Sequence, residues 1–566
     1  MGTRVLIVGG VAGGASTAAR IRRLDAEADI TVFEKGEHVS FSNCALPYYL
    51  SRMVEERDNL ILMTPEGFRD SYDIDVRVRN EVLSIDRANK KVMVKDHAAD
   101  REYEETYDVL VLSPGSVPIR PRSIEGVTLP HVFTVRNVTD IAKLDDYVKK
   151  VDSKNIVVVG GGFIGLEVAE NLKMSGRKVA VVEAADQVMM PFDYDMVQIL
   201  HKELVDHGME LVLSDGVQSI TPEKVILKSG KELPADVVVL SIGVLPDTAL
   251  AKAAGLEIGE TGAIKVSPDF RTSDPNIYAV GDAIETYHRL SMKPTKLQLA
   301  GPAARQARTA ANSICGIPGT FNKGGIGSCA VKVFEMNAMA TGLNERTAKS
   351  LGIPCDAVYT MGMDKVGIMP GSAPVHFKLI FEVPTGRILG AQAIGRGSAD
   401  KRIDVIATMI TMNGTLEDLK ELELCYSPLY STSRDVVNQA ALVGLNILHG
   451  VYKQARVDEV RGLVESGACI IDVRTPEEYD YGHFVGAVNI PLYELRQRLD
   501  EIPKDRPVYL HCRTSQRSYN ALMALKHRGF DNVVNISGSF LGASYYEYYN
   551  DLTTGRKKIV TNYNFD

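Results

Sequence analysis

Long apolar runs that end in glycine mark the first half of the chain. Residues 4–10 (RVLIVGG) and 156–162 (IVVVGGG) are uninterrupted apolar runs, and each opens a stretch with helical spacing. Runs of this kind are typical of buried parallel strands, because such strands are covered on both faces. Two further runs, 107–116 and 236–247, each carry a strand into a turn. The pattern predicts two units in which strands and helices alternate around a parallel sheet.

The second half of the chain has a different pattern. From Gly325 apolar and polar residues alternate, as in 329–336 and 375–383, which predicts half-buried antiparallel strands and a third domain. Beyond residue 452 a helical segment precedes a buried strand, and strand and helix alternate to about residue 550. This predicts a fourth domain of α/β type. The last residues, 551–566, show no clear period, and we expect a tail there.

Composition, charge and cysteine usage narrow the class of protein. The 566 residues are 45% apolar and 24% charged, which suits a globular chain of three or four domains. A formal charge of −8 without a long basic block argues against a nucleic-acid partner. No apolar run approaches the roughly 18–20 residues that cross a bilayer, so we expect a cytoplasmic chain with no membrane partner. Seven cysteines without paired spacing predict free thiols, and we expect any cysteine with a special role to be catalytic rather than structural.

The turn after the first apolar run carries a phosphate-binding pattern. Gly9, Val11 and Gly14 occupy the positions of G-x-G-x-x-G, with valine in place of the second glycine. Glu34 follows at the end of the strand ITVFE. A pyrophosphate at a helix N-terminus requires small residues, and an acid at the next strand end accepts from a ribose hydroxyl. The pattern therefore predicts a dinucleotide site.

The second apolar run carries the complete form of this pattern. Gly160, Gly162 and Gly165 match all three glycines, and Glu183 follows at the end of VAVVE. A carboxylate there accepts from a ribose 2′-OH and repels a 2′-phosphate, which favours NADH over NADPH. Two nucleotide sites in one chain indicate one flavin and one nicotinamide, so we expect FAD and NADH as cofactors.

A third nucleotide-site feature is Gly281-Asp282, which follows an apolar strand in TSDPNIYAVGDA. With it, the chain resembles the flavoprotein disulfide reductases that have two dinucleotide-binding domains. The resemblance implies that Asp282 contacts the ribityl chain of FAD and that Glu167 lies beside the nicotinamide.

One isolated cysteine stands just beyond the first nucleotide motif. Cys44 lies in SFSNCALPYY, and the C-x-x-x-x-C pair common in such reductases is missing from the sequence. The motif resembles S-F-x-N-C-G-L-P-Y of the single-cysteine coenzyme A-disulfide reductases. With one thiol, reduction must pass through a mixed disulfide or persulfide with an outside sulfur. The resemblance implies coenzyme A as that partner, and we place Ser40 and Asn43 in its site.

Two further groups of residues support the same resemblance. Arg20, Arg22 and Arg23 stand on the predicted first helix, where this family binds the phosphates of coenzyme A. Tyr426 and Tyr430, in YSPLY, are similar to the tyrosines of Y-A-P-P-Y, which reach the cysteine of the partner subunit. A phenol can donate a proton to a leaving thiolate. The resemblance thus implies a homodimer with catalytic tyrosines at its interface.

The chain also departs from the family pattern. Ala45 replaces the glycine after the cysteine, and Ile368-Met369 stand where relatives commonly carry tyrosines. These changes bear on which disulfide or persulfide is the substrate, and they leave the flavin half unaffected.

The C-terminal part resembles a rhodanese module. Residues 472–491 and the segment YLHCRTSQRS match its pattern, and four residues separate Cys512 from Arg517. Backbone N–H groups of a tight loop, together with a guanidinium, can hold an anionic persulfide. Phosphatases of similar design have one more residue in this loop, so the spacing favours sulfane sulfur. Ser515 stands where the family often has glycine, which predicts an altered loop shape.

The predicted fold class is α/β, with two Rossmann-like dinucleotide-binding domains, an α+β dimerisation domain and a C-terminal α/β rhodanese domain. The predicted boundaries are 1–120 and 248–322 for FAD binding, 121–247 for NAD binding, 323–447 for dimerisation, 452–550 for the rhodanese domain and 551–566 for the tail.

The function that these residues predict is an NADH-dependent reduction of persulfide, polysulfide or coenzyme A disulfide at Cys44. Cys512 would collect sulfane sulfur, which a donor protein could supply, and pass it to coenzyme A or Cys44. Two alternatives stay open: an NADH oxidase that uses oxygen or peroxide through a Cys44 sulfenic acid, and a sulfurtransferase whose flavoprotein part senses redox state. No metal site is predicted.

Overall fold

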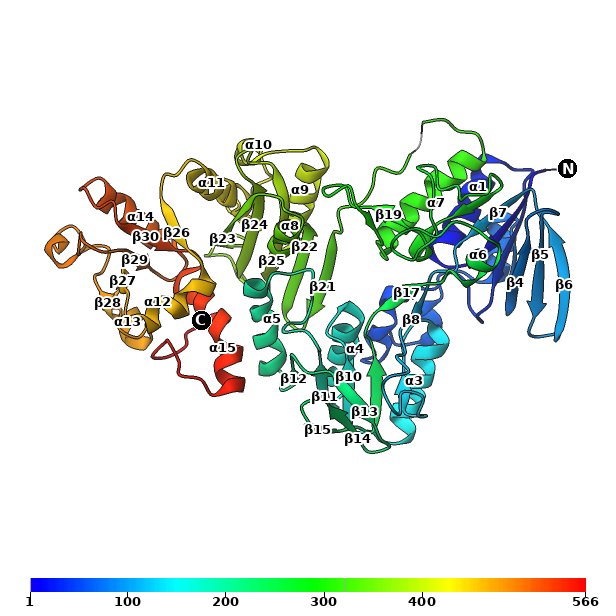
Figure 1. Ribbon diagram of the computed structural model, residues 1–566, viewed down its shortest axis with the longest axis horizontal. Helices are drawn as coiled ribbons and strands as arrows, with labels where there is room; N and C mark the ends of the chain where they lie inside the picture. The colour runs from blue at the N-terminus through cyan, green and yellow to red at the C-terminus, as the bar shows by residue number, and fades with distance from the viewer. Residues whose placement is uncertain (1, 320, 566) are drawn as a thin grey trace. The chain divides into compact units, whose positions relative to one another are not determined.

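Figure 1 shows the computed structural model, which describes residues 2–319 and 321–565. The chain forms two compact units. The first contains the residues up to Asp186 and Val212–Gly325, and the second contains Gln187–Leu211 and the residues from Ile326.

A five-stranded parallel sheet forms the first nucleotide domain of the first unit. Its interior strands are continuous apolar segments such as VLIV, which bury side chains on both faces as parallel strands must. Helices α1 and α7 pack against each other beside this sheet (Figure 1). The strand order is β18 (Ile277–Ala279), β7 (Val109–Leu112), β1 (Arg4–Val8), β2 (Asp29–Glu34) and β3 (Asp75–Val78), and the helices are α1 (Ala12–Leu24), α2 (Pro65–Tyr72), α6 (Ala249–Ala253) and α7 (Ala300–Ile314).

The second nucleotide domain repeats this plan. Its central strands β10, β11 and β16 are parallel and almost fully buried, and helix α4 begins directly after the glycine turn that follows β10. The strand order is β12 (Glu210–Val212), β11 (Lys178–Val182), β10 (Asn155–Val159), β16 (Val237–Leu240) and β9 (Val132–Phe133), with helices α3 (Val138–Lys150) and α4 (Phe163–Met174). The two predicted parallel-sheet domains are thereby confirmed.

Small antiparallel sheets complete the first unit. They are formed by β4 (Asn80–Asp86), β5 (Lys91–Asp96) and β6 (Arg101–Thr106), by β13 (Val217–Ile220), β14 (Lys224–Leu227) and β15 (Glu232–Pro234), by β8 (Ser116–Pro118) and β17 (Val244–Pro246), and by β19 (Thr286–Tyr287) and β20 (Pro294–Thr295).

An antiparallel sheet forms the core of the second unit, as the alternating pattern predicts. The expectation of half-buried strands is wrong for the segment 375–383, because residues 375–381 are buried on both faces of the sheet. Strands β24 and β25 lie in its middle and are buried along nearly their whole length. The order is β21 (Cys329–Val333), β22 (Met336–Gly342), β25 (Ile388–Gly395), β24 (Pro374–Glu382) and β23 (Cys355–Met363), with helices α8 (Glu345–Ser350), α9 (Asp400–Thr411), α10 (Leu416–Lys420) and α11 (Val436–Leu448).

The last domain is a five-stranded parallel sheet with helices, as expected. Its order is β26 (Lys453–Ala455), β30 (Val533–Ile536), β29 (Val508–His511), β27 (Cys469–Asp472) and β28 (Val488–Asn489), and its helices are α12 (Val460–Glu465), α13 (Pro476–Tyr481), α14 (Gln516–Lys526) and α15 (Ser539–Thr554). Within the described part of the chain, no helix is both long and apolar enough to cross a membrane.

Two segments differ from the sequence-based expectation. The prediction of a tail from residue 551 is wrong, because Ile559 and Val560 are buried and Val560 forms a β-bridge with Phe484. Helix α5 (Tyr194–Asp206) belongs to the second unit, although the sequence places it within the NAD domain. The helix packs there against α15, and the Tyr549 hydroxyl donates to the carbonyl oxygen of Leu211 over 3.0 Å.

Candidate active sites

At two positions of the first glycine turn, the surrounding backbone leaves no room for a side chain, so the turn requires glycine there. Gly9 has a φ of +93°, and a Cβ there would overlap the carbonyl of Ser113. A Cβ on Gly14 would overlap the carbonyl of Gly9. Val11 caps the start of α1 at the remaining motif position, where its φ of −101° is open to any residue. The chain therefore passes tightly from β1 into the N-terminus of α1, the place where such motifs bind a phosphate.

Glu34 closes the same site at the end of β2. Its two carboxylate oxygens accept hydrogen bonds from the backbone N–H groups of Gly10, at 3.0 Å, and Gly36, at 2.8 Å. The acid is therefore fixed beside the glycine turn and keeps lone pairs for a ribose hydroxyl.

The second glycine turn has the same geometry and an open position. Gly160 has a φ of +108°, and a Cβ on Gly165 would overlap the carbonyl of Gly160. Around a Cβ on Gly162, by contrast, no other atom lies within 4 Å, so space for a phosphate remains at the start of α4. Glu183 accepts from the N–H groups of Gly161, at 2.7 Å, and Ala185, at 2.9 Å. The two sites fit FAD and a nicotinamide dinucleotide.

Two predicted site residues from separate segments, Glu167 and Asp282, act on Cys44 through their charges. Cys44 is exposed on the short helical turn η1 (Asn43–Ala45), and Asp282 stands on η4 (Gly281–Ala283). Partial burial raises the pKa of the Cys44 thiol, and the negative charges of Glu167 and Asp282 raise it further. Burial likewise raises the pKa of Asp282, whose carboxylate accepts from the Ser116 hydroxyl at 3.4 Å. The protein around Cys44 therefore favours the thiol over the thiolate.

Tyr48 belongs to this site and escapes prediction from the sequence. It lies on η2 (Pro47–Tyr49), directly after Cys44, and its hydroxyl donates to Oε1 of Glu167 over 3.4 Å. Burial raises the pKa of Tyr48 to about 12 and that of Glu167 to about 7. The spacing of the cysteine motif does not point to this contact, because the two residues lie 119 positions apart.

The three arginines of α1 differ in what they contact. Arg22 donates to backbone carbonyl oxygens at the end of α2, including those of Tyr72, at 2.8 Å, and Asp73, at 2.7 Å. Arg20 donates to Asn312 of α7, and the Arg23 guanidinium lies over the Tyr72 ring. Arg22 thus has a structural task of its own, and the coenzyme A contacts of all three remain a prediction.

The segment beside Cys44 contacts the first glycine turn through a backbone hydrogen bond. Ser40 adopts a left-handed φ of +46°, and its N–H donates to the carbonyl oxygen of Gly10 at 2.9 Å. Asn43 is exposed next to Cys44. The segment that carries the cysteine is therefore tied to the dinucleotide turn, and the role of both residues in coenzyme A binding remains a prediction.

The predicted interface tyrosines lie in an exposed loop of the second unit. Tyr426 is 52% exposed and Tyr430 71%, between α10 and α11. The loop adjoins the segment where relatives carry tyrosines, because the N–H of Val366 donates to the carbonyl oxygen of Pro428 at 3.3 Å. Ile368 in that segment is 85% exposed. Together these residues form an apolar and aromatic patch.

The cysteine of the C-terminal domain lies in a closed loop. Cys512 follows β29 and is 1% exposed, its N–H donates to the Ser539 hydroxyl at 3.2 Å, and the Ser518 hydroxyl lies 3.7 Å from its sulfur. Ser515 has a left-handed φ of +77°, a conformation that glycine adopts without strain. The loop that the family builds with glycine is therefore formed with serine.

Arg517 is oriented by a residue that sequence reasoning did not select. Its two terminal nitrogens donate to Glu478 of α13 at 2.6 and 2.7 Å, and the guanidinium also interacts with Cys512. Glu478 is the N3 residue of a capping box with Thr475. Its signal in the sequence is Thr-Pro-Glu-Glu, a typical helix start, which says nothing of a contact 39 residues away.

Comparisons with known proteins extend these observations. Residues 3–307 match the family model described as pyridine nucleotide-disulphide oxidoreductase, 328–436 its dimerisation domain and 456–544 a rhodanese-like domain. The chain is 34% identical over 435 residues to a coenzyme A disulfide reductase of Staphylococcus epidermidis, covering 77% of this chain and 98% of that protein.

Two solved structures are similar over nearly the whole length. The reduced CoADR-RHD of Bacillus anthracis is 42% identical, with a TM-score of 0.94 over 97% of this chain and 99% of the other. An NAD-dependent persulfide reductase from A. fulgidus is 36% identical, with a TM-score of 0.90 over 95% and 99%. The chain therefore belongs to the pyridine nucleotide-disulphide oxidoreductase family and carries that family's dimerisation domain followed by a rhodanese-like domain.

Proposed function

We propose that this chain is an NADH-dependent reductase of persulfides, polysulfides or coenzyme A disulfides, in which Cys44 forms the covalent bond to the substrate sulfur. The observation that carries the proposal is the interaction of Cys44 with Glu167 and Asp282, which brings residues of three separate motifs into one site. Two similar proteins, a coenzyme A disulfide reductase and an NAD-dependent persulfide reductase, support it.

The covalent step at Cys44 follows from its position as a lone thiol. The Cys44 thiolate attacks one sulfur of a disulfide RS–SR′, forms the bond Cys44–S–SR and releases R′S⁻. Two electrons that derive from NADH then break this bond, which restores the thiolate and releases RS⁻. With a persulfide RS–SH, attack on the outer sulfur releases RS⁻, and the two electrons then release HS⁻. FAD, when bound, supplies the transfer of electrons between nicotinamide and sulfur.

Glu167 and Tyr48 control the charge around the thiol. A carboxyl with a pKa of about 7 is partly protonated near neutral pH, so Glu167 can hold a proton close to Cys44. In that form it no longer opposes the thiolate electrostatically. Tyr48 orients the carboxyl through its hydrogen bond to Oε1.

Coenzyme A is the thiol carrier in this proposal. Arg20, Arg22 and Arg23 would contact its phosphates, and Ser40 and Asn43 would flank the thiol end beside Cys44. The rhodanese cysteine, Cys512, would accept sulfane sulfur and deliver it to coenzyme A or to Cys44. Arg517 would neutralise the persulfide anion.

A homodimer is the assembly that we propose. The patch of Tyr426, Tyr430, Leu429 and Ile368 exposes large side chains that a second copy would cover, as the matched dimerisation domain supports. Tyr426 and Tyr430 would then donate to the thiolate at the partner's active site. Because the reaction consumes NADH, we place the enzyme in the cytoplasm.

A cysteine variant tests the proposal directly. Cys44→Ser should abolish NADH oxidation that depends on coenzyme A disulfide, coenzyme A persulfide or polysulfide, while NADH still bleaches the flavin. Cys425→Ser is the matched control, because Cys425 is the other exposed free thiol among the described residues. Turnover of every sulfur substrate by Cys44→Ser would refute the proposal. Activity with oxygen alone would instead support the NADH oxidase.

A further inference from the structure

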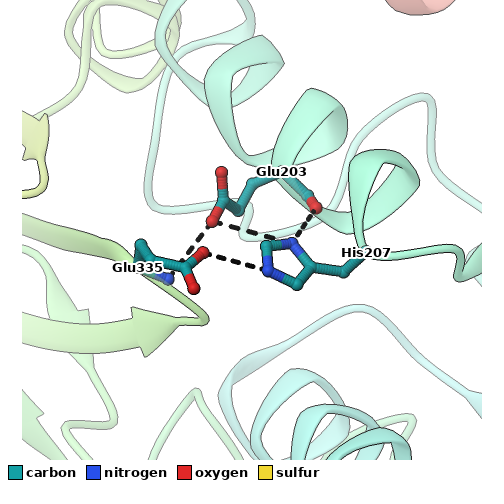
Figure 2. A group of neighbouring side chains, drawn as sticks. All are labelled: Glu203, His207 and Glu335. Carbon is teal, nitrogen blue, oxygen red and sulfur yellow. Dashed lines mark hydrogen bonds and ion pairs between the residues drawn. The ribbon is translucent and has the colours of Figure 1, made fainter.

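A histidine and two glutamates meet beside the end of helix α5, apart from the sites described above (Figure 2). Glu203 lies in the last turn of α5, and His207 follows as the C-cap residue. Glu335 stands in the short turn between β21 and β22. One ligand atom from each side chain lies within 4.8 Å of the others. All three residues belong to the second unit.

The His207 ring is held in one orientation and one tautomer. Its Nδ1 lies 2.9 Å from the backbone carbonyl oxygen of Glu203. A carbonyl oxygen can only accept, so Nδ1 carries a proton and donates it. The ring also stacks on Phe334, with centroids 3.8 Å apart and planes 1° from parallel. Nε2 is therefore the nitrogen aimed at Glu335, and histidine ligands of metals are typically held in this way.

The two carboxylates lie close to each other and to the imidazole. The Glu203 side chain is only 6% exposed, and its Oε1 accepts from the Glu335 N–H at 3.2 Å. Oε2 of Glu335 lies 3.0 Å from Nε2 of His207.

We propose that Glu203, His207 and Glu335 form a binding site for a divalent transition-metal ion of the zinc class. One imidazole nitrogen and two carboxylate oxygens are a ligand set that suits this ion, at about 2.0–2.2 Å each. Glu203 closes the inner side of the site, whereas the His207 and Glu335 side chains are 31% and 55% exposed. Water can therefore enter from outside and complete a tetrahedral shell.

Charge and connectivity agree with this assignment. A divalent ion balances the charge of the two carboxylates beside the imidazole, against the opposing positive charge of Arg396, which also acts on Glu335. The ion would join α5 to the β21–β22 turn, two segments 132 positions apart. Its binding should therefore stabilise the second unit, because it occurs only when both segments are folded. The site is independent of the sulfur chemistry proposed above.

Zinc content under buffered free Zn²⁺ tests the site in the full-length protein. His207→Ala and Glu335→Gln should each lose one equivalent of zinc, with binding at least about tenfold weaker than in the wild type. His97→Ala is the matched control, because His97 forms an ordinary exposed pair with Glu81 at 2.9 Å. Any zinc bound by cysteines is the same in the wild type and the three variants, so it does not affect the difference in zinc content.

A second measurement locates the ion. Anomalous scattering at the zinc edge should place a peak beside Nε2 of His207, and zinc should raise the melting temperature of the wild type but not of Glu335→Gln. Equal zinc content in the wild type and Glu335→Gln, or a peak at cysteines only, would overturn the proposal. Should His207→Ala fail to fold, Glu335→Gln in its exposed turn decides the question alone. Binding of Mg²⁺ in place of zinc would also overturn it, because magnesium does not need the imidazole.

Discussion

The Tyr48 hydroxyl donates a hydrogen bond to Oε1 of Glu167 across 3.4 Å. Tyr48 follows Cys44 in sequence, whereas Glu167 stands on α4, after the second glycine turn. The contact therefore joins the segment of Cys44 to the helix that follows this turn, within the same unit. Glu167 in turn acts on Cys44 through its charge.

Replacing Tyr48 should shift the pH dependence of turnover. The hydrogen bond from Tyr48 lowers the pKa of Glu167, against the burial that raises it to about 7. Tyr48→Phe should raise this pKa by roughly half to one unit, since a hydrogen bond is worth about 1 kcal/mol. The limb near pH 7 in the pH profile of kcat/KM for NADH should move upward accordingly. Tyr49→Phe should leave this limb unchanged. Equal pH profiles for the wild type and Tyr48→Phe would show that the Tyr48–Glu167 hydrogen bond does not affect the pKa of Glu167.

The ionisation of Cys44 should respond to Glu167. Burial and the charges of Glu167 and Asp282 raise the pKa of Cys44, so the thiolate forms only at higher pH. Glu167→Gln removes one of these charges, which lowers the pKa and should shift the rate of alkylation toward lower pH. Iodoacetamide labelling of Cys44, followed by mass spectrometry across pH, measures this. Glu478→Gln, in the rhodanese-like domain, serves as control, and an upward shift in Glu167→Gln would contradict the assignment.

NADH should be preferred over NADPH because of Glu183. Its carboxylate is fixed by the N–H groups of Gly161 and Ala185, in the position of a ribose-binding acid. A 2′-phosphate beside it is repelled, and a penalty of ~1.4 kcal/mol corresponds to tenfold in specificity. Glu183→Ala should reduce the ratio of kcat/KM for the two cofactors by about tenfold or more. Asp186→Asn is the comparison variant, and equal efficiencies in the wild type would refute the prediction.

Sulfur loading of the rhodanese-like domain should depend on Arg517. Arg517→Ala removes the guanidinium that interacts with Cys512, and it leaves Glu478 without its bidentate partner. After exposure to a sulfane donor, the mass of the wild type should rise by one sulfur on Cys512, and Arg517→Ala should gain much less. Arg498→Ala, an exposed arginine paired with Glu501, should load normally.

Loss of sulfur delivery has its own test. If the fused domain is the proposed sulfur carrier, held at high effective concentration, Cys512→Ser should spare reduction of a free persulfide and impair that of polysulfide or of sulfur from a donor protein. Unchanged turnover of all donors, with no sulfur gained on Cys512, would mean that the domain does not take part in the reaction.

Lys378 should be essential for the stability of the second unit. Its buried ammonium lies 2.8 Å from Asp195, 3.1 Å from Glu345 and 3.2 Å from Asp193. Lys378→Met leaves three acids without their shared cation, which should cost about 3–5 kcal/mol. Lys420→Met, at a more exposed pair with Glu417, should cost less than about 1 kcal/mol. Urea unfolding followed by circular dichroism compares the two, and equal midpoints would refute the prediction.

The sequence alone determined the features that depend on residues adjacent in the chain, such as strands and tight turns. Runs such as residues 4–8 and 155–159 could be recognised as buried parallel strands, because a strand covered on both faces must be apolar at every position. The glycines at 9 and 160 could be recognised because the turn itself, through its positive φ, requires them. Cys44 and Cys512 were selected because the continuous motifs around them resemble those of known families, and their roles stay predictions.

Only the tertiary structure decided which distant side chains meet. Tyr48 with Glu167, Arg517 with Glu478, and Glu335 with His207 each join segments whose separation carries no periodic signal. The burial of Ile559 and Val560 was hidden for the same reason, since a short apolar pair shows no period until Phe484 is placed against it. Local sequence sets the conformation of a segment, whereas the contacts between segments follow from how the domains close around their cores.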